Sequence, residues 1–189
     1  MKRIIVYSLF ILGIVGVALA SHPNDKIDPK NFNTKLFEKA LFFKVNEYRK
    51  ENGLRPMMSN SIIHKVAKDH NDFLKGEKQI THDQPTAEKA SVQDRLKFYL
   101  NVKSFAVGEN IARTFVLKPT YNYDRKGKTN LSTAKTYAEA AEYMFNAWKQ
   151  SDFHNKNMLN PKYEIAAIAA YFNPKDFSLT ATQVFARID

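Results

Sequence analysis

Three side chains in this sequence have the chemistry to act together: the imidazoles of His82 and His154 and the carboxylate of Glu109. Each is a polar group set among apolar stretches, where an unpartnered polar group is costly. Two imidazoles and one carboxylate suit a zinc site with an open fourth position, and equally an acid/base pair with a polarising carboxylate. The three residues are far apart in the sequence, so the fold alone can bring them together.

Two further histidines, His64 and His70, belong to a helix that the apolar spacing predicts over about residues 60–75. Being six residues apart, they do not share a helix face, and the i, i+4 spacing of a helical metal pair is missing. We therefore expect structural roles for both, either at the surface or partly buried.

The remaining patterns predict helices first and strands last. Apolar spacing of three and four from Asn33 predicts a helix that Gly53 ends, and capping boxes at Ser91–Asp94 and Thr136–Glu139 predict two more. Residues 105–115 read as a strand or an irregular buried turn, and residues 117–131 as a long surface loop. Two apolar runs, 163–172 and 177–188, predict a closing hairpin. This order is typical of an α+β domain.

The first twenty residues have the pattern of a secretory signal peptide. Lys2 and Arg3 precede an apolar run, which ends in Ala18-Leu19-Ala20. We expect cleavage after Ala20, with a retained membrane anchor as the alternative. Residues 21–33 then read as a flexible lead-in and residues 34–189 as one domain, located in the cell envelope or secreted.

The composition restricts the source and the partners. The chain of 189 residues has no cysteine, and an exported protein without disulfides points to a bacterium. Removing Lys2 and Arg3 from the 29 basic residues leaves 27 against 19 acidic ones, a net charge of +8. We expect a monomer that meets anionic surfaces or lipid rather than nucleic acid. The densest basic spot is Arg125, Lys126 and Lys128.

The order of several motifs resembles the CAP superfamily, the cysteine-rich secretory, allergen and pathogenesis-related proteins with an SCP domain, in its short bacterial form. The resemblance covers about residues 36–187. Its motifs, in chain order, are Val45-Asn46-x-x-Arg49-x-x-x-Gly53-Leu54, His82 after the second helix, Gly108-Glu109-Asn110-Ile111-Ala112, the segment Trp148-x-x-Ser151-x-x-His154-x-x-Asn157-x-Leu159-x-Pro161-x-Tyr163, and Thr182-Gln183-x-Phe185.

The resemblance implies a three-layer αβα sandwich with a central, mainly antiparallel sheet and a large surface cleft. His82 and His154 match the family's two cleft histidines, and Glu109 matches the first of its two glutamates. The second glutamate has no match, because Ser151 stands in its place. The chain also has Phe153 and Asn155 around His154, where the bacterial pattern has Gly and Arg, and Ala166 where it has Gly.

Three functions remain open on these residues. The first is an exported binding protein that binds lipid or a host or envelope partner. Its cleft, which includes Glu109, Asn110 and Ser151, can take a divalent metal such as zinc on His82 and His154. The metal is not expected to be needed for folding. The second is a metal-dependent hydrolase, a peptidase or esterase, with Glu109 as the catalytic residue. The incomplete set of carboxylates favours binding over catalysis.

The third function is an adhesin that acts through its basic loop. In that case Arg125, Lys126 and Lys128 would contact an anionic surface, and the cleft would have no part in the contact.

Overall fold

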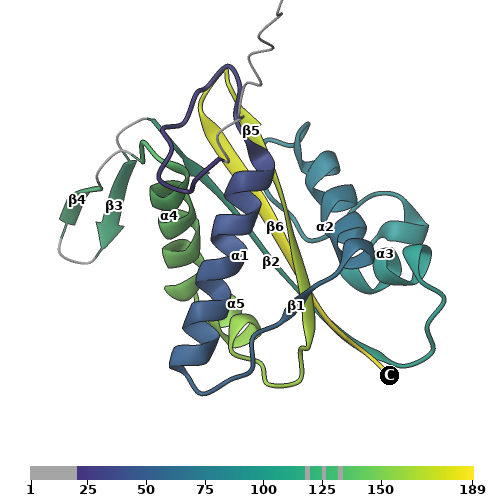
Figure 1. The fold of residues 1–189 in the computed structure, drawn as a ribbon. Coiled ribbons are helices and arrows are strands. Elements are labelled where there is room, and N and C mark those ends of the chain that lie inside the picture. The colour runs from purple at the N-terminus through teal and green to yellow at the C-terminus, as the bar shows by residue number, and fades with distance from the viewer. Residues whose placement is uncertain (1–20, 118–119, 125–126, 132–133) are drawn as a thin grey trace, which may run out of the picture.

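The computed structural model describes residues 21–117, 120–124, 127–131 and 134–189 of the chain. The expected signal peptide, residues 1–20, lies outside this part. Helices cover both faces of a central sheet, so the protein is a three-layer αβα sandwich of the α+β class, as expected (Figure 1). No helix in the described part is long and apolar enough to cross a membrane.

Four of the five α-helices in the described part of the chain begin and end close to where the sequence signals predict. They are α1 (Thr34–Glu51), α2 (Ser61–Leu74), α3 (Val92–Tyr99), α4 (Tyr137–Lys149) and α5 (Asp152–Met158), with a 3₁₀ turn η1 (Ala87–Lys89). Both predicted capping boxes are present, before α3 and before α4. Gly53, with φ 72°, follows α1 in the left-handed conformation that favours glycine. The sequence did not predict α5, because seven residues are too few for a periodic apolar pattern.

The main sheet has the order β1-β5-β6-β2. Its strands are β1 (Met58–Ser59), β2 (Phe105–Phe115), β5 (Ile165–Asn173) and β6 (Ser178–Ile188). Both β2 and β5 are antiparallel to β6, which confirms the closing hairpin, and the short β1 is parallel to β5. The segment 105–115 is thus a strand. Because successive residues of a strand face opposite ways, Glu109 and Asn110 lie on opposite faces of the sheet.

Two apolar clusters hold the three layers together. The larger lies between the sheet and α1, α4 and α5, and includes Met144, Phe145 and Trp148, all buried as their helical spacing predicts. The smaller lies on the other face, under α2 and α3, and is centred on Ile63, Val66 and Leu96. The sheet is therefore covered on both faces and acts as the core of the domain.

Arg49 of the first motif bonds within the fold. Its side chain is buried, and its guanidinium donates to four backbone carbonyls, those of Arg55, Met158, Asn160 and Tyr163, at 2.7 to 3.3 Å. These carbonyls belong to the connection that follows α1, to the last residue of α5 and to the connection that follows α5. Arg49 thus ties α1 to the start of the closing hairpin.

Residues 21–33 differ from the predicted flexible lead-in. Ile27 is 6% exposed, and its backbone N–H donates to Lys135 O at 2.8 Å. The carbonyl of Pro23 accepts from Ala138 N at 2.7 Å, and so satisfies an unpaired N–H in the first turn of α4. One buried side chain and the open donors at the start of a helix are enough to hold this segment in place.

Residues 117–131 also differ from the prediction, which was a loop. They contain a two-stranded sheet of β3 (Thr120–Asp124) and β4 (Gly127–Leu131), paired antiparallel with Asp124 opposite Gly127. The Asn, Asp, Pro and Gly residues that suggested a loop are compatible with a hairpin, because its threonines and tyrosines favour the extended backbone. The side chains of Arg125, Lys126 and Lys128 lie outside the described part of the structure.

Gly108 generates a prediction about packing. A Cβ on Gly108 would lie 2.4 Å from Tyr163 Oη and 3.2 Å from Asn157 Oδ1. We expect Gly108→Ala to lower the free energy of unfolding by about 1–3 kcal/mol, since the ring or α5 must move. Urea unfolding measures this loss. Gly76→Ala is the control, because its nearest neighbour is 4.0 Å away. Equal losses in the two variants would contradict the prediction.

Candidate functional site

Glu109 of β2 is at the centre of a buried polar cluster. Its side chain is 2% exposed, and Oε2 accepts from Arg95 Nη2 at 2.7 Å. Arg95 comes from α3 and is itself fully buried. The other oxygen, Oε1, accepts from Nδ1 of His82 at 2.9 Å. Both carboxylate oxygens are therefore occupied by donors of the protein itself.

Two buried side chains, those of Arg95 and His70, hold the loop that carries His82. Arg95 donates to the backbone carbonyl of His82 at 3.2 Å. His70 of α2 is fully buried and donates from Nε2 to Thr81 O at 2.7 Å, while its Nδ1 accepts from Gln84 Nε2 at 3.1 Å. These two bonds are satisfied only by the neutral Nε2–H tautomer of His70. The position of His82 thus depends on α2 and α3 together.

The three histidines of the cluster have different electrostatic environments. The hydrogen bond to Glu109 raises the pKa of His82 above the ordinary 6.5, against the opposing effect of burial. Burial lowers the pKa of His70 below 6.5, so its ring is neutral at pH 7 and its 3.9 Å contact with Glu109 is not an ion pair. Burial also lowers the pKa of His154, and the charge of His82 adds to that effect.

His154 reaches the cluster from α5, on the other side of β2. Its backbone carbonyl accepts from Asn110 Nδ2 at 3.0 Å. Asn157, one turn further along α5, donates to Glu109 O at 3.2 Å and to Asn110 Oδ1 at 2.9 Å. Nδ1 of His154 is buried with no hydrogen-bond partner among the described residues. The structure therefore brings His82 and Glu109 into contact and places His154 within range of the His82 charge.

The other predicted cleft residues have structural positions. Asn110 is fully buried and holds α5, and Ser151 is the N-cap residue of α5 without a side-chain cap bond. The two glutamates on α4 lie elsewhere, because Glu139 completes a capping box and Glu142 pairs with Lys44. Neither glutamate of α4 joins Glu109.

Few side chains of this cluster could serve as ligands to a metal ion. Within the part of the chain that the structure describes, no three His, Asp or Glu side chains are arranged to hold a metal. Glu109 uses both oxygens on Arg95 and His82, so it fits the role of a carboxylate that orients a ligating imidazole rather than that of a ligand. Two imidazoles remain, which is fewer than the three protein ligands of a typical catalytic zinc site.

Sequence reasoning missed Arg95, His70 and Gln84. Arg95 sits in the predicted short helix beside Asp94, so nothing in its local sequence marks Glu109 as its partner, and Gln84 lies in a polar loop. His70 occurs on the apolar face of α2, which indicated burial but not the partners. Their roles depend on contacts between residues 11 to 14 positions apart, which local patterns do not show.

Sequence reasoning also missed a groove between α1 and α4. Its volume is about 730 Å³, and its apolar lining comes from both helices: Leu36, Ala40, Phe43, Tyr48, Ala138, Ala141 and Phe145. Phe43 is 62% exposed although it belongs to a well-formed amphipathic helix. The sequence signal for this groove is Phe43, a large aromatic residue that lies outside the apolar stripe of α1.

Removing the Glu109 charge is expected to destabilise the fold. In Glu109→Gln the guanidinium of Arg95 stays buried without a counter-charge, which should cost about 3–5 kcal/mol of unfolding free energy. Chemical denaturation followed by circular dichroism measures the loss. The matched control is Glu88→Gln, because Glu88 is exposed. A Glu109→Gln protein as stable as the control would show that the pair is not structurally important.

The histidines should titrate in a defined order. In a proton NMR titration we expect His82 to titrate above pH 6.5 and His154 below it, because the bond to Glu109 favours the charged form of the first and burial disfavours that of the second. Protonated His82 therefore stabilises the fold fully below pH 6.5, and this contribution is lost as pH rises through its folded pKa. Its pKa should fall in Glu109→Gln. The reverse order of titration would contradict the assignment.

Comparisons with known proteins agree with this architecture. The model of the CAP family, the cysteine-rich secretory protein family, matches residues 42–185, whereas no curated protein matches. The fold is similar to an outer surface protein from Borrelia burgdorferi, with a TM-score of 0.63 and 20% identity over 88% of this chain and 99% of that one. It is also similar to an extracellular SCP-domain protein from Bacillus anthracis, with a TM-score of 0.59 and 22% identity over 82% of this chain and 41% of that one.

At such identities the two solved structures are evidence for the fold alone. The family model spans most of the chain and contains every motif that carried the resemblance, from Val45 to Phe185. The chain therefore belongs to the CAP family of cysteine-rich secretory proteins.

Proposed function

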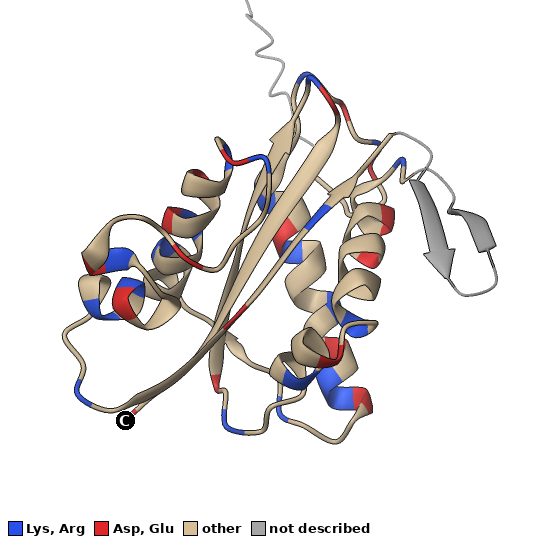
Figure 2. Cartoon of the chain, turned by 180° about the vertical axis from the view of Figure 1, so that it is seen from behind, with Lys and Arg blue, Asp and Glu red and all other residues tan. Residues whose placement is uncertain are grey.

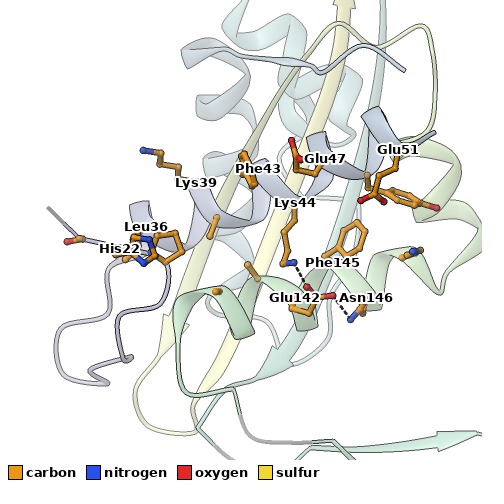
Figure 3. A pocket seen from close by; sticks show the side chains of 17 residues that line it. His22, Leu36, Lys39, Phe43, Lys44, Glu47, Glu51, Glu142, Phe145 and Asn146 are labelled. Carbon is orange, nitrogen blue, oxygen red and sulfur yellow. Dashed lines mark hydrogen bonds and ion pairs between the residues drawn. The ribbon is translucent and has the colours of Figure 1, made fainter. Parts of the chain in front are cut away.

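We propose that this protein is an exported binding protein whose ligand is an amphiphilic lipid, held in the groove between α1 and α4. The groove itself carries the proposal. Its volume of about 730 Å³ lies in the range of pockets that enclose small ligands, and apolar side chains line both of its walls. Figure 3 shows Phe43 on the α1 side and Phe145 on the α4 side.

The rim of the groove suits an amphiphile rather than a purely apolar ligand. Lys39, Lys44 and Glu47 of α1 stand along one edge, and Glu142 and Asn146 of α4 along the other. Lys44 and Glu142 form an ion pair across the groove (Figure 3). An acyl chain between the helices would bury about 0.8 kcal/mol of apolar contact per CH₂ group, while a polar head could stay at the rim.

The polar cluster supports binding rather than catalysis. A general base must reach the proton that it takes, and the side chain of Glu109 is 2% exposed, with its oxygens bonded to Arg95 and His82. Figure 2 shows acidic and basic residues interspersed along the helices. We therefore assign the cluster to the architecture of the domain and the groove to its ligand.

Phe43 provides the test of the lipid site. We expect Phe43→Ser to weaken binding of a fluorescent long-chain fatty acid about tenfold, because the ligand loses an aromatic contact worth roughly 1–2 kcal/mol. Phe98→Ser is the matched control, since Phe98 is 55% exposed on α3, away from the groove. Fluorescence titration gives both affinities. Equal affinities in the two variants, or no binding by the unmodified protein, would refute the proposal.

A second candidate ligand is a divalent metal on His82 and His154. Two observations favour this candidate. Nδ1 of His154 has no hydrogen-bond partner among the described residues. Nδ1 of His82 bonds to Glu109, so Nε2 is the ring nitrogen of His82 that remains for a metal. With two protein ligands we expect weak zinc binding that is not required for folding.

Calorimetry with zinc tests this second candidate. We expect His154→Ala to abolish the binding isotherm and His64→Ala to leave it unchanged, because His64 pairs with Glu38 outside the cluster. Binding that survives His154→Ala would exclude the pair as the zinc site.

A further inference from the structure

A second concave site lies on the face of the sheet opposite the groove. Helices α2 and α3 cover this face (Figure 1), and a pocket of about 640 Å³ opens between α2, η1 and the end of α3. We call it the α2 pocket. Its charged and amide side chains are Lys65, Lys68, Asp69, Asp72, Gln84 and Lys89. A lining of this kind suits a polar ligand rather than an acyl chain.

Asp69 of α2 connects the elements that form the α2 pocket. Its Oδ1 accepts from Gln84 Nε2 at 3.2 Å, and its Oδ2 accepts from Lys89 Nζ of η1 and from the hydroxyl of Tyr99 at the end of α3. Although burial opposes the shift, the bonds from Lys89 and Tyr99 lower the pKa of Asp69 below the ordinary 3.8. The pocket is therefore built around a charged pair that three further elements hold in one arrangement.

Lysines outnumber carboxylates at the α2 pocket. Lys68 and Lys75 both pair with Asp72, and Lys89 pairs with the carboxylate already described. Lys65, one turn before Lys68 on the same face of α2, is exposed and makes no ion pair within the described residues. Four ammonium groups thus share two carboxylates, which leaves a local excess of two positive charges. An anionic group that enters the pocket would meet this excess.

Two aromatic rings and a free hydroxyl complete the lining of the α2 pocket. Phe73 and Tyr99 are both partly exposed, and the bond from Tyr99 to Asp69 fixes the second ring. Thr86 is exposed at the edge of the pocket. Aromatic rings offer an apolar surface to the C–H groups of a sugar, whereas the threonine hydroxyl can donate to or accept from its hydroxyl groups.

We propose that the α2 pocket binds an acidic glycan, with its anionic groups on Lys65 and Lys68 and a sugar ring against Phe73 and Tyr99. Sulfate and carboxylate groups share the chemistry that these lysines recognise. A basic exported protein is attracted to such polymers at cell surfaces. The site has no residue in common with the groove between α1 and α4, so it does not depend on the proposed lipid binding.

Two lysines provide the first test. Calorimetry compares a sulfated dextran oligosaccharide, an oligogalacturonate of equal length and an unsulfated dextran oligosaccharide. We expect the protein to bind at least one anionic oligosaccharide, which identifies the anion, and not the neutral one. Lys65→Gln combined with Lys68→Gln should weaken this binding about fivefold, a typical sum for two exposed ion pairs. Asp72 keeps Lys75 as its partner in this variant.

The control for this test is Lys162→Gln combined with Lys175→Gln. Both of these lysines are exposed outside the α2 pocket, and the double substitution changes the net charge by the same amount. It should leave the affinity within about twofold of the unmodified protein. Equal losses in the two double variants, binding of the neutral oligosaccharide alone, or no binding at all would refute the proposal.

A second experiment separates a glycan from other polyanions. We expect Phe73→Leu to weaken the anionic oligosaccharide about threefold, because the sugar loses an aromatic surface, and to leave the binding of polyphosphate unchanged. Unchanged polyphosphate binding also shows that the variant is folded. Equal losses for both polyanions, or no loss, would overturn the glycan assignment. Tighter binding to phosphatidylglycerol vesicles than to the oligosaccharide would identify a membrane site instead. Phe43→Ser should change none of these affinities, and a loss there would contradict a separate site.

Discussion

The buried pair between Arg95 and Glu109 is the interaction on which the layered structure depends most. A carboxylate and a guanidinium, both removed from water, are stable only together and with their other hydrogen-bonding groups satisfied. Arg95 meets most of this need with carbonyls of the loop before α3, although its Nε has no hydrogen-bond partner among the described residues, and Glu109 meets it with His82. The pair thereby joins an edge strand, a short helix and the loop that carries His82.

The segment Gly108–Asn110 connects all three layers because of the alternation of a strand. Glu109 points to the layer of α2 and α3, whereas Asn110 points to α5 and holds the backbone of His154. Gly108 leaves room for Tyr163, whose ring stacks on Phe185 of the neighbouring strand with centroids 5.4 Å apart. The contacts of Gly108, Glu109 and Asn110 therefore give the most specific motif of the family an architectural role.

The groove has a different physical origin. Helices α1 and α4 run parallel on one face of the sheet, with their large apolar residues directed toward it, and small residues such as Ala40, Ala138 and Ala141 line the space between them. Small side chains leave a volume that the two helices cannot fill themselves. The proposed site for a ligand thus arises from what these helices lack.

The sequence by itself determined the family, the α+β class, the capped helices and the closing hairpin, because these follow from local periodicity, capping chemistry and the order of motifs. It also predicted, through the resemblance to the family, that His82, Glu109 and His154 share one cleft. Tertiary structure alone decided that Arg95 neutralises Glu109, that His70 supports His82, and that residues 21–33 pack at the end of a groove. Each of these depends on contacts across long sequence separations, where burial and charge are set by neighbours that no local pattern encodes.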